Sequence, residues 1–145
     1  MWVAVAVSLL VSLTPWAQYL LYPFRLFATW VHECSHAVMT VLVGGRVTSV
    51  TIAPDTSGLT LSLVPVSRLP SALVASAGYL GAALVGCLLM AATRVEKRAR
   101  GILLALGIVM IFTVVVWMRN AFGIAVVLAW GARIPWCRSA ARHNA

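Results

Sequence analysis

His32, Glu33 and His36 have side chains and a spacing that suit metal-dependent hydrolysis. On an α-helix successive residues turn by about 100°, so His32 and His36 project from one face about 40° apart. Two neutral imidazoles one helical turn apart can share a Zn²⁺ ion. A carboxylate beside them can accept a proton from a water molecule that such an ion activates. The pattern therefore predicts a zinc site in which Glu33 is the general base.

The surroundings of this motif argue against a chance match. The chain has three histidines and three acidic residues among 145, and the motif uses two of those histidines. Ionisable side chains in an apolar segment are costly unless they are paired, bound to metal or placed in a wet cavity, and they usually mark a functional site. The alternative is a polar cluster that serves the structure and binds no metal.

The composition is that of a membrane-embedded protein. Hydrophobic residues make up 62% of the chain and charged residues 10%. The length allows one domain with about four membrane spans. The net charge of +8 comes from arginines and lysines that stand singly or in short groups between apolar runs. This arrangement is typical of residues that flank membrane spans, so we expect the lipid bilayer as a partner and no nucleic acid.

The motif lies in the second predicted span. Residues 2–22 form the first span, which lacks the basic start of a cleaved signal peptide, and Pro23 separates it from a second span over 24–43. Gly44 and Gly45 then provide a helix stop. A 20-residue helix is about 30 Å long, so the motif would lie about 12 Å from one end and inside the bilayer.

Residues 46–65 predict a β-hairpin. Apolar residues alternate with Thr and Ser on both sides of the turn sequence Asp55-Thr56-Ser57-Gly58. A hairpin beside a membrane helix has unpaired backbone groups on its edge, so it must lie at the surface or in a protein-lined cavity. Its edge could bind an extended peptide, or the hairpin could be a plain connection.

Two further spans are predicted over 70–92 and 102–118. The fold class is thus an α-helical integral membrane protein, a single domain over 1–145, with the hairpin inserted between the second and third of about four spans. Glycines in the third span favour close helix packing. Residues 121–132 form either an interfacial helix or the second half of a helix that is broken inside the membrane.

The membrane orientation stays open. The densest basic stretch lies between the third and fourth spans, which makes it the best cytoplasmic candidate. A single further crossing would place the C-terminal arginines on the opposite side.

Together these features resemble the site-2 protease class of intramembrane zinc metalloproteases, in particular its small bacterial M50B-like branch. The residues that carry the resemblance span nearly the whole chain: His32 to His36, Gly44-Gly45-Arg46-Val47, the hairpin with Gly58, Ala77-Gly78-Tyr79-Leu80-Gly81, and Arg119-Asn120-Ala121-Phe122-Gly123. The resemblance implies that His32 and His36 bind Zn²⁺ and that Glu33 activates water for attack on a peptide bond. It also implies a bacterial plasma membrane protein with a membrane-anchored protein substrate.

One part of the family pattern is missing from the sequence. Site-2 proteases take a third metal ligand from an Asp-Gly motif on a later helix, and this chain has no Asp-Gly. Asn120 stands in roughly the matching place, although an amide oxygen is a poorer zinc ligand than a carboxylate. Asp55 is the other candidate, but turn chemistry explains this residue equally well. Water or a segment beyond residue 145 could also complete the site.

The missing aspartate keeps a second hypothesis open. In this hypothesis the chain is a catalytically inactive, protease-like subunit that scaffolds or regulates a larger membrane protein complex. Its partners would then be other subunits and not a substrate.

Overall fold

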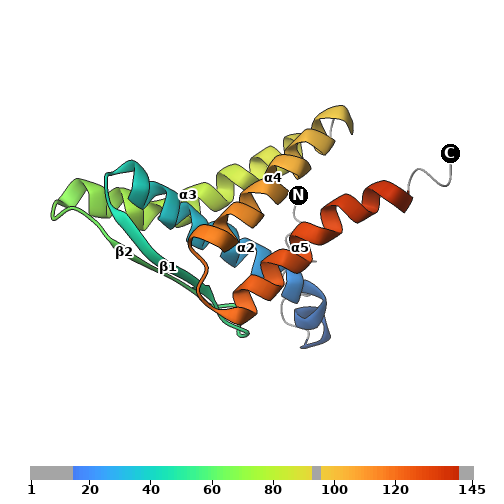
Figure 1. Ribbon diagram of the computed structural model, residues 1–145, viewed down its shortest axis with the longest axis horizontal. Helices are drawn as coiled ribbons and strands as arrows, with labels where there is room; N and C mark the ends of the chain where they lie inside the picture. The colour runs from blue at the N-terminus through green and yellow to red at the C-terminus, as the bar shows by residue number, and fades with distance from the viewer. Residues whose placement is uncertain (1–14, 93–95, 141–145) are drawn as a thin grey trace, which may run out of the picture.

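The structure is a computed structural model that describes residues 15–92 and 96–140. Within these residues the chain forms four helices and one two-stranded sheet: α2 (Pro15–Leu42), β1 (Arg46–Ile52), β2 (Gly58–Leu63), α3 (Arg68–Ala92), α4 (Glu96–Val116) and α5 (Ala121–Ala140). The predicted helical fold with one antiparallel hairpin is confirmed. Figure 1 shows that the hairpin follows α2 and that α4 and α5 form a separate pair. Most of the predicted first span, and residues 93–95 of the basic loop, lie outside the described residues.

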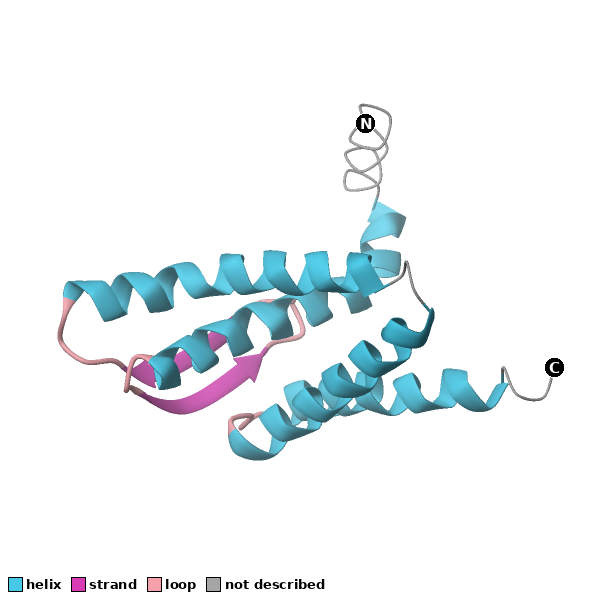
Figure 2. Ribbon diagram, turned by 90° about the horizontal axis from the view of Figure 1, so that it is seen from above, coloured by secondary structure: helices cyan, strands magenta, loops and turns pink. Residues whose placement is uncertain are grey.

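Helix α2 runs through Pro23, so the predicted break at this residue is not found. Proline removes one backbone donor and clashes with the preceding turn, which kinks a helix but need not end it when tertiary contacts support both sides. Figure 2 shows the first turns of the helix at an angle to the remainder. The His-Glu-x-x-His motif therefore lies in the second half of a 28-residue helix.

Helix α2 ends at the predicted glycines. Gly44 has a φ of 79°, its N–H donates to Val41 O over 3.1 Å, and the N–H of Gly45 donates to Thr40 O over 2.8 Å. These two bonds form a Schellman cap, which favours glycine because of its left-handed backbone. A Cβ on Gly45 would lie 2.6 Å from Leu63 O. Glycines at both positions thus let the chain reverse and lay the hairpin along α2.

The hairpin pairs Arg46 with Leu63 at its open end and Ile52 with Gly58 at the turn. The other edge of β1 is also used: Val50 N donates to Trp117 O over 2.9 Å, and Val50 forms a parallel bridge with Met118. Among the described residues no strand pairs with the outer edge of β2. The hairpin therefore has one covered edge and one open edge.

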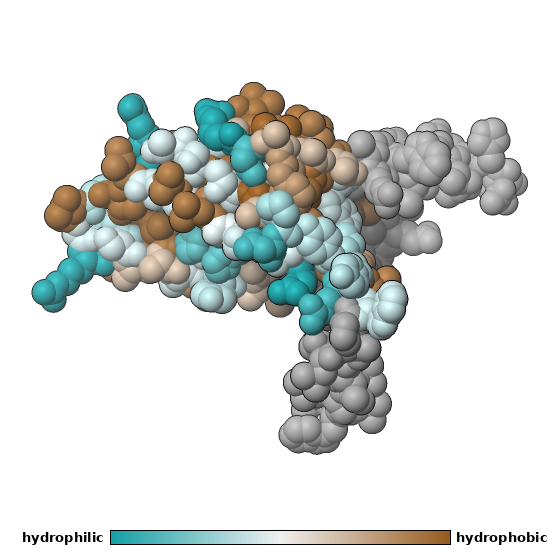
Figure 3. Space-filling model, turned by 90° about the horizontal axis from the view of Figure 1, so that it is seen from below, coloured by the Kyte–Doolittle hydropathy of each residue, from teal (hydrophilic) through white to brown (hydrophobic). Residues whose placement is uncertain are grey.

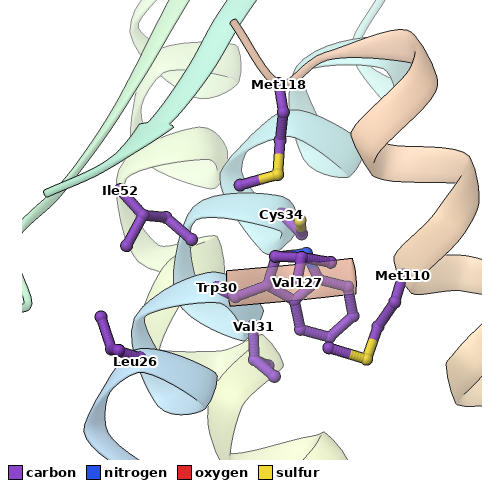
Figure 4. Packing of buried hydrophobic residues seen from close by; sticks show 8 residues of the cluster. All are labelled: Leu26, Trp30, Val31, Cys34, Ile52, Met110, Met118 and Val127. Atoms are coloured by element: carbon purple, nitrogen blue, oxygen red, sulfur yellow. The ribbon is translucent and has the colours of Figure 1, made fainter. Parts of the chain in front are cut away.

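A buried apolar cluster joins α2 to the hairpin and to the α4–α5 pair. It consists of eight residues: Leu26, Trp30, Val31, Cys34, Ile52, Met110, Met118 and Val127. Figure 4 shows Trp30 in the middle of this cluster, between α2 and the side chains of Met110 and Val127. The indole N–H donates to Thr113 Oγ1 over 3.1 Å, which satisfies the polar atom of this buried ring. The cluster fixes the face of α2 that lies away from α3.

Of the described helices, one is long and apolar enough to cross a membrane, over Arg68–Ala91. Gly101–Val116 and Ala121–Gly131 are shorter apolar helices. Helix α2 falls outside this class because its charged residues and two histidines lower its mean hydropathy. This measure thus supports one of the predicted spans.

Apolar side chains nevertheless cover much of the outer surface. Trp16, Tyr19, Leu20, Leu80 and Leu84 are between 61% and 83% exposed. Figure 3 shows one face of the molecule, where apolar side chains in brown spread over a wide area between scattered polar ones. Exposed apolar surfaces of this extent mark contact with a membrane or a partner protein.

Candidate metal centre

The two histidines of the motif converge on one point between α2 and α3. Their Nε2 atoms are 3.1 Å apart, and their ring centroids are 4.7 Å apart at an interplanar angle of 82°. Two imidazole nitrogens bound to one tetrahedral Zn²⁺ at about 2.0–2.1 Å lie about 3.3 Å from each other. The separation of the two Nε2 atoms is that of an N–H···N hydrogen bond, and it is also close to the separation that a shared zinc ion requires.

A backbone hydrogen bond sets the tautomer of His36. Its Nδ1 lies 2.6 Å from Val74 O in α3. A carbonyl oxygen can only accept, so Nδ1 carries a proton, and in the neutral ring Nε2 is then the nitrogen with the lone pair. A second nitrogen bonded to a backbone carbonyl is the usual arrangement of a metal-binding histidine. His36 is thus held in the form and orientation of a metal ligand.

Gly78 of α3 keeps the space beside the two Nε2 atoms open. A Cβ at this position would lie 2.6 Å from His32 Nε2 and 2.5 Å from His32 Cε1, and still closer to His36 Nε2. Any side chain here would fill the space that a shared ion needs. Gly81, one turn later, meets Ser35 of α2 equally closely, whereas Gly86 has nothing within 4 Å. The predicted close packing is therefore found at Gly78 and Gly81.

Glu33 lies on the adjoining face of α2, under the hairpin. It is 7% exposed, and its Oε2 accepts a hydrogen bond of 2.7 Å from Thr60 Oγ1 of β2. A Cβ on Gly58 would lie 2.7 Å from Glu33 Oε1. The carboxylate is therefore enclosed by β2, on a helix position that directly follows His32. Two histidine nitrogens with an adjacent, hydrogen-bonded carboxylate are suited to metal-assisted hydrolysis.

The two candidates for a third ligand lie in other surroundings. Asn120 Nδ2 donates to Ile52 O over 2.6 Å, and its Oδ1 accepts from Ile52 N over 3.3 Å. Asp55 is in the hairpin turn, where its Oδ1 accepts from Ser57 Oγ over 2.6 Å and from Ser57 N over 2.9 Å. These hydrogen bonds hold the pKa of Asp55 below its ordinary value. Among the described residues, no group of three or more His, Cys, Asp and Glu side chains could hold a metal ion.

Sequence reasoning missed the residues that surround the motif. Gly78 was expected to serve helix packing alone, and Thr60 was expected to be one of the polar residues of an alternating strand. Tyr79 was named only as part of a family motif, and its contact with the site was not predicted: its ring meets that of His32 edge to face, with centroids 4.8 Å apart. The glycine pair Gly78 and Gly81 was the available signal, because glycines three apart on one helix face mark where another element comes very close.

A helix that presents two histidines and a glutamate to a glycine-bearing helix and a hairpin is the arrangement of a metalloprotease-like site. The chain belongs to the Peptidase M50B-like family, whose model matches residues 2–141. No curated protein and no solved structure matches the chain. Proteins of the M50 family are membrane proteases and are typically zinc-dependent. The resemblance inferred from the sequence is confirmed at the level of the family.

Proposed function

We propose that this protein is a zinc-dependent intramembrane metalloprotease that hydrolyses a peptide bond of a membrane-anchored substrate. The observation that carries the proposal is the pair of Nε2 atoms of His32 and His36, which lie 3.1 Å apart beside the space left by Gly78. Membership of the M50B-like family supports the same assignment.

The Nε2 atoms of His32 and His36 are suited to be two of the ligands of a zinc ion. His32 and His36 would hold Zn²⁺ through Nε2, and the bond from His36 Nδ1 to Val74 O would keep the second ring oriented. When bound, Zn²⁺ supplies a Lewis acid for the scissile carbonyl and lowers the pKa of water. Asn120 and Asp55, the two residues that the sequence offers as a third ligand, are engaged in hydrogen bonds with Ile52 and Ser57, so we assign neither of them to the metal and leave the remaining positions to water.

Glu33 is the base of the proposed reaction. Its carboxylate takes the proton of the attacking water and afterwards returns a proton to the leaving amine. The Thr60 hydroxyl holds Oε2, so Oε1 is the oxygen left for this transfer. Burial beneath the hairpin limits access of bulk water to the carboxylate, which strengthens its interactions with neighbouring charges.

The hairpin is suited to hold a substrate in an extended conformation. An extended peptide exposes its carbonyl groups to attack, whereas a helix uses them in its own hydrogen bonds. Because β1 is paired on both sides, the outer edge of β2 is the edge available for strand addition. This edge lies on the strand that contacts Glu33.

A location in the bacterial plasma membrane is part of the proposal. The helix over Arg68–Ala91 has the length and composition of a span, and the exposed apolar side chains provide a surface for lipid.

Zinc content of the purified, detergent-solubilised chain tests the proposal. We expect about one zinc per chain, loss of that zinc in His36→Ala, and no loss in the control His143→Ala, which changes the remaining histidine. Glu33→Gln should keep the zinc and lower hydrolysis by about 10²- to 10⁴-fold. A chain that binds no zinc, or hydrolysis that persists in Glu33→Gln, would contradict the assignment.

The inactive-subunit hypothesis has one observation in its favour, the absence of a three-residue ligand set among the described residues. It predicts a heteromeric complex that survives detergent extraction. It also predicts that Glu33→Gln changes neither the assembly of that complex nor the phenotype of cells that depend on it.

A further inference from the structure

We propose that Thr60 is a positioning residue that fixes the carboxylate of Glu33 and thereby ties the base of the site to the hairpin. This inference rests on the proposed function, in which Glu33 accepts the proton of water. Thr60 belongs to β2 and lies 27 residues from Glu33 in the sequence.

The Thr60 hydroxyl reaches two acceptors of the same residue. Its Oγ1 is 2.7 Å from Glu33 Oε2 and 3.0 Å from the backbone oxygen of Glu33. A hydroxyl has one proton, which these two acceptors share. The bridge between backbone and carboxylate restricts the three side-chain torsions of Glu33, a long side chain that is otherwise free to choose among many rotamers.

Gly58 provides a second contact between the same strand and the same carboxylate. Residues 58 and 60 point to one face of β2, because side chains alternate along a strand. A Cβ at Gly58 would lie 2.6 Å from Glu33 Cγ and 2.7 Å from Oε1. One face of β2 therefore provides a donor to Oε2 and, because Gly58 has no Cβ, packs closely against the Oε1 side of the carboxylate.

The hairpin is held on α2 by contacts that do not involve Glu33. Tyr22 Oη donates to Pro54 O over 2.7 Å, and Thr29 Oγ1 donates to Thr56 O over 2.8 Å. These bonds lie along the stripe of α2 that leads to Glu33. They help to fix the register of the hairpin on the helix, so the position of Thr60 does not depend on its own bond to the carboxylate alone.

A resonance of the Glu33 carboxyl group reports the contact without an activity assay. The sequence has two glutamates, so ¹³C labelling of glutamate side-chain carboxyls in a Glu96→Gln background leaves the signal of Glu33 alone. Thr60→Val removes the hydroxyl at nearly constant volume and should shift this resonance. Thr60→Ser keeps the hydroxyl and should return the resonance to its original position.

Hydrolysis of fluorescein-labelled casein by the full chain reports the consequence. We expect Thr60→Val to lower kcat by about 10- to 100-fold with little change in KM, because the base is misplaced while substrate contacts remain. Thr60→Ser should stay within about threefold of the parent in kcat. Thr51→Val is the matched control: it removes a hairpin hydroxyl that bonds Leu59 O and not Glu33.

The outcomes are distinct. An unmoved Glu33 resonance in Thr60→Val, or equal kcat values for Thr60→Val and Thr51→Val, would overturn the positioning role. Loss of zinc in Thr60→Val would also overturn it, since the effect would then be structural. If the parent chain cleaves no casein, the protease proposal loses support from this probe, and the resonance alone decides whether Thr60 holds Glu33.

Discussion

Gly78 is the residue on which the metal centre depends most directly after the histidines themselves. A single methyl group at this point of α3 would lie against the Nε2 atoms of both histidines. Neither Gly78 nor Val74 has a side chain that binds metal. Gly78 nevertheless leaves room for an ion, and the backbone oxygen of Val74 sets the tautomer of His36.

Gly78→Ala should weaken zinc binding without unfolding the protein. The added Cβ collides with both imidazoles, and we expect zinc affinity to fall by about 10- to 100-fold. Alanine favours a helix over glycine by about 1 kcal/mol, so α3 itself should not lose stability. Competition with a zinc chelator measures the change. Gly86→Ala is the control, because a Cβ at Gly86 meets open space, and equal zinc affinity of the two variants would contradict the role given to Gly78.

Asp55 should titrate below its ordinary range and bind no zinc. The hydrogen bonds from Ser57 lower its pKa, so the turn is stabilised above the unfolded-state pKa of about 3.9 and loses this contribution as the pH falls through the lower folded-state value. Asp55 is the sole aspartate, so ¹³C labelling of aspartate carboxyls follows it alone. Ser57→Ala should raise the midpoint. Zinc loss in Asp55→Asn would instead make this residue a ligand.

At the scale of elements, the hairpin is held between two helical units. Its face contacts α2 at Thr29 and Glu33, and its β1 edge is joined to the α4–α5 connection by Trp117 and Asn120. Asn120 bonds both the N–H and the C=O of Ile52, as a neighbouring strand would. The α4–α5 pair therefore stabilises the strand that supports β2.

Asn120→Ala should destabilise this connection and leave zinc in place. The substitution removes two hydrogen bonds and leaves the backbone N–H and C=O of Ile52 without these partners. We expect this loss to lower the free energy of unfolding by about 1–3 kcal/mol. A lower midpoint of thermal unfolding with unchanged zinc content would show this role. Asn120→Asp distinguishes a structural role from a role as zinc ligand. If Asn120 is structural, the variant loses stability, because a carboxylate cannot donate to Ile52 O. If residue 120 binds the metal, the variant gains zinc affinity, because a carboxylate is a better zinc ligand than an amide.

Features that depend on neighbouring residues in the sequence could be predicted, whereas features that depend on tertiary contacts could not. The stop at Gly44-Gly45 and the hairpin around Asp55 follow from turn chemistry that neighbouring residues determine alone. The path of α2 through Pro23 depends on tertiary support that no local pattern contains. The approach of Thr60 to Glu33 depends on the register of the hairpin on α2, a contact across 27 residues. The ligand spacing was thus visible in the sequence, whereas the groups that orient the ligands were not.

At the scale of the whole molecule, the α4–α5 pair changes the expected topology. The two helices are joined by four residues and pack against each other, and Figure 1 shows α5 returning toward the end of the molecule where α4 begins. Their apolar parts, Gly101–Val116 and Ala121–Gly131, are about 24 and 17 Å long, short of a hydrocarbon core of about 30 Å. We therefore expect them to enter and leave the membrane on one side.

This topology would bring the basic residues of α4 and α5 to one side of the membrane. Lys97, Arg98 and Arg100 are in the first turns of α4, and Arg133 and Arg138 are in the second half of α5. Under the positive-inside rule we expect this side to be cytoplasmic, which would remove the conflict that a single crossing raises.

Labelling of single cysteines in whole cells tests this topology. In a background without the three native cysteines, Ala99→Cys and Ser139→Cys should resist a membrane-impermeant maleimide added from outside. Ser67→Cys, next to the opposite end of α3, should react. Labelling of Ser139→Cys from outside while Ala99→Cys stays protected would mean that α5 crosses the membrane. The α4–α5 connection, which bonds β1, would then lie next to a membrane-spanning helix and not at the tip of a re-entrant pair. The hairpin and the metal centre would consequently lie at a different depth in the membrane.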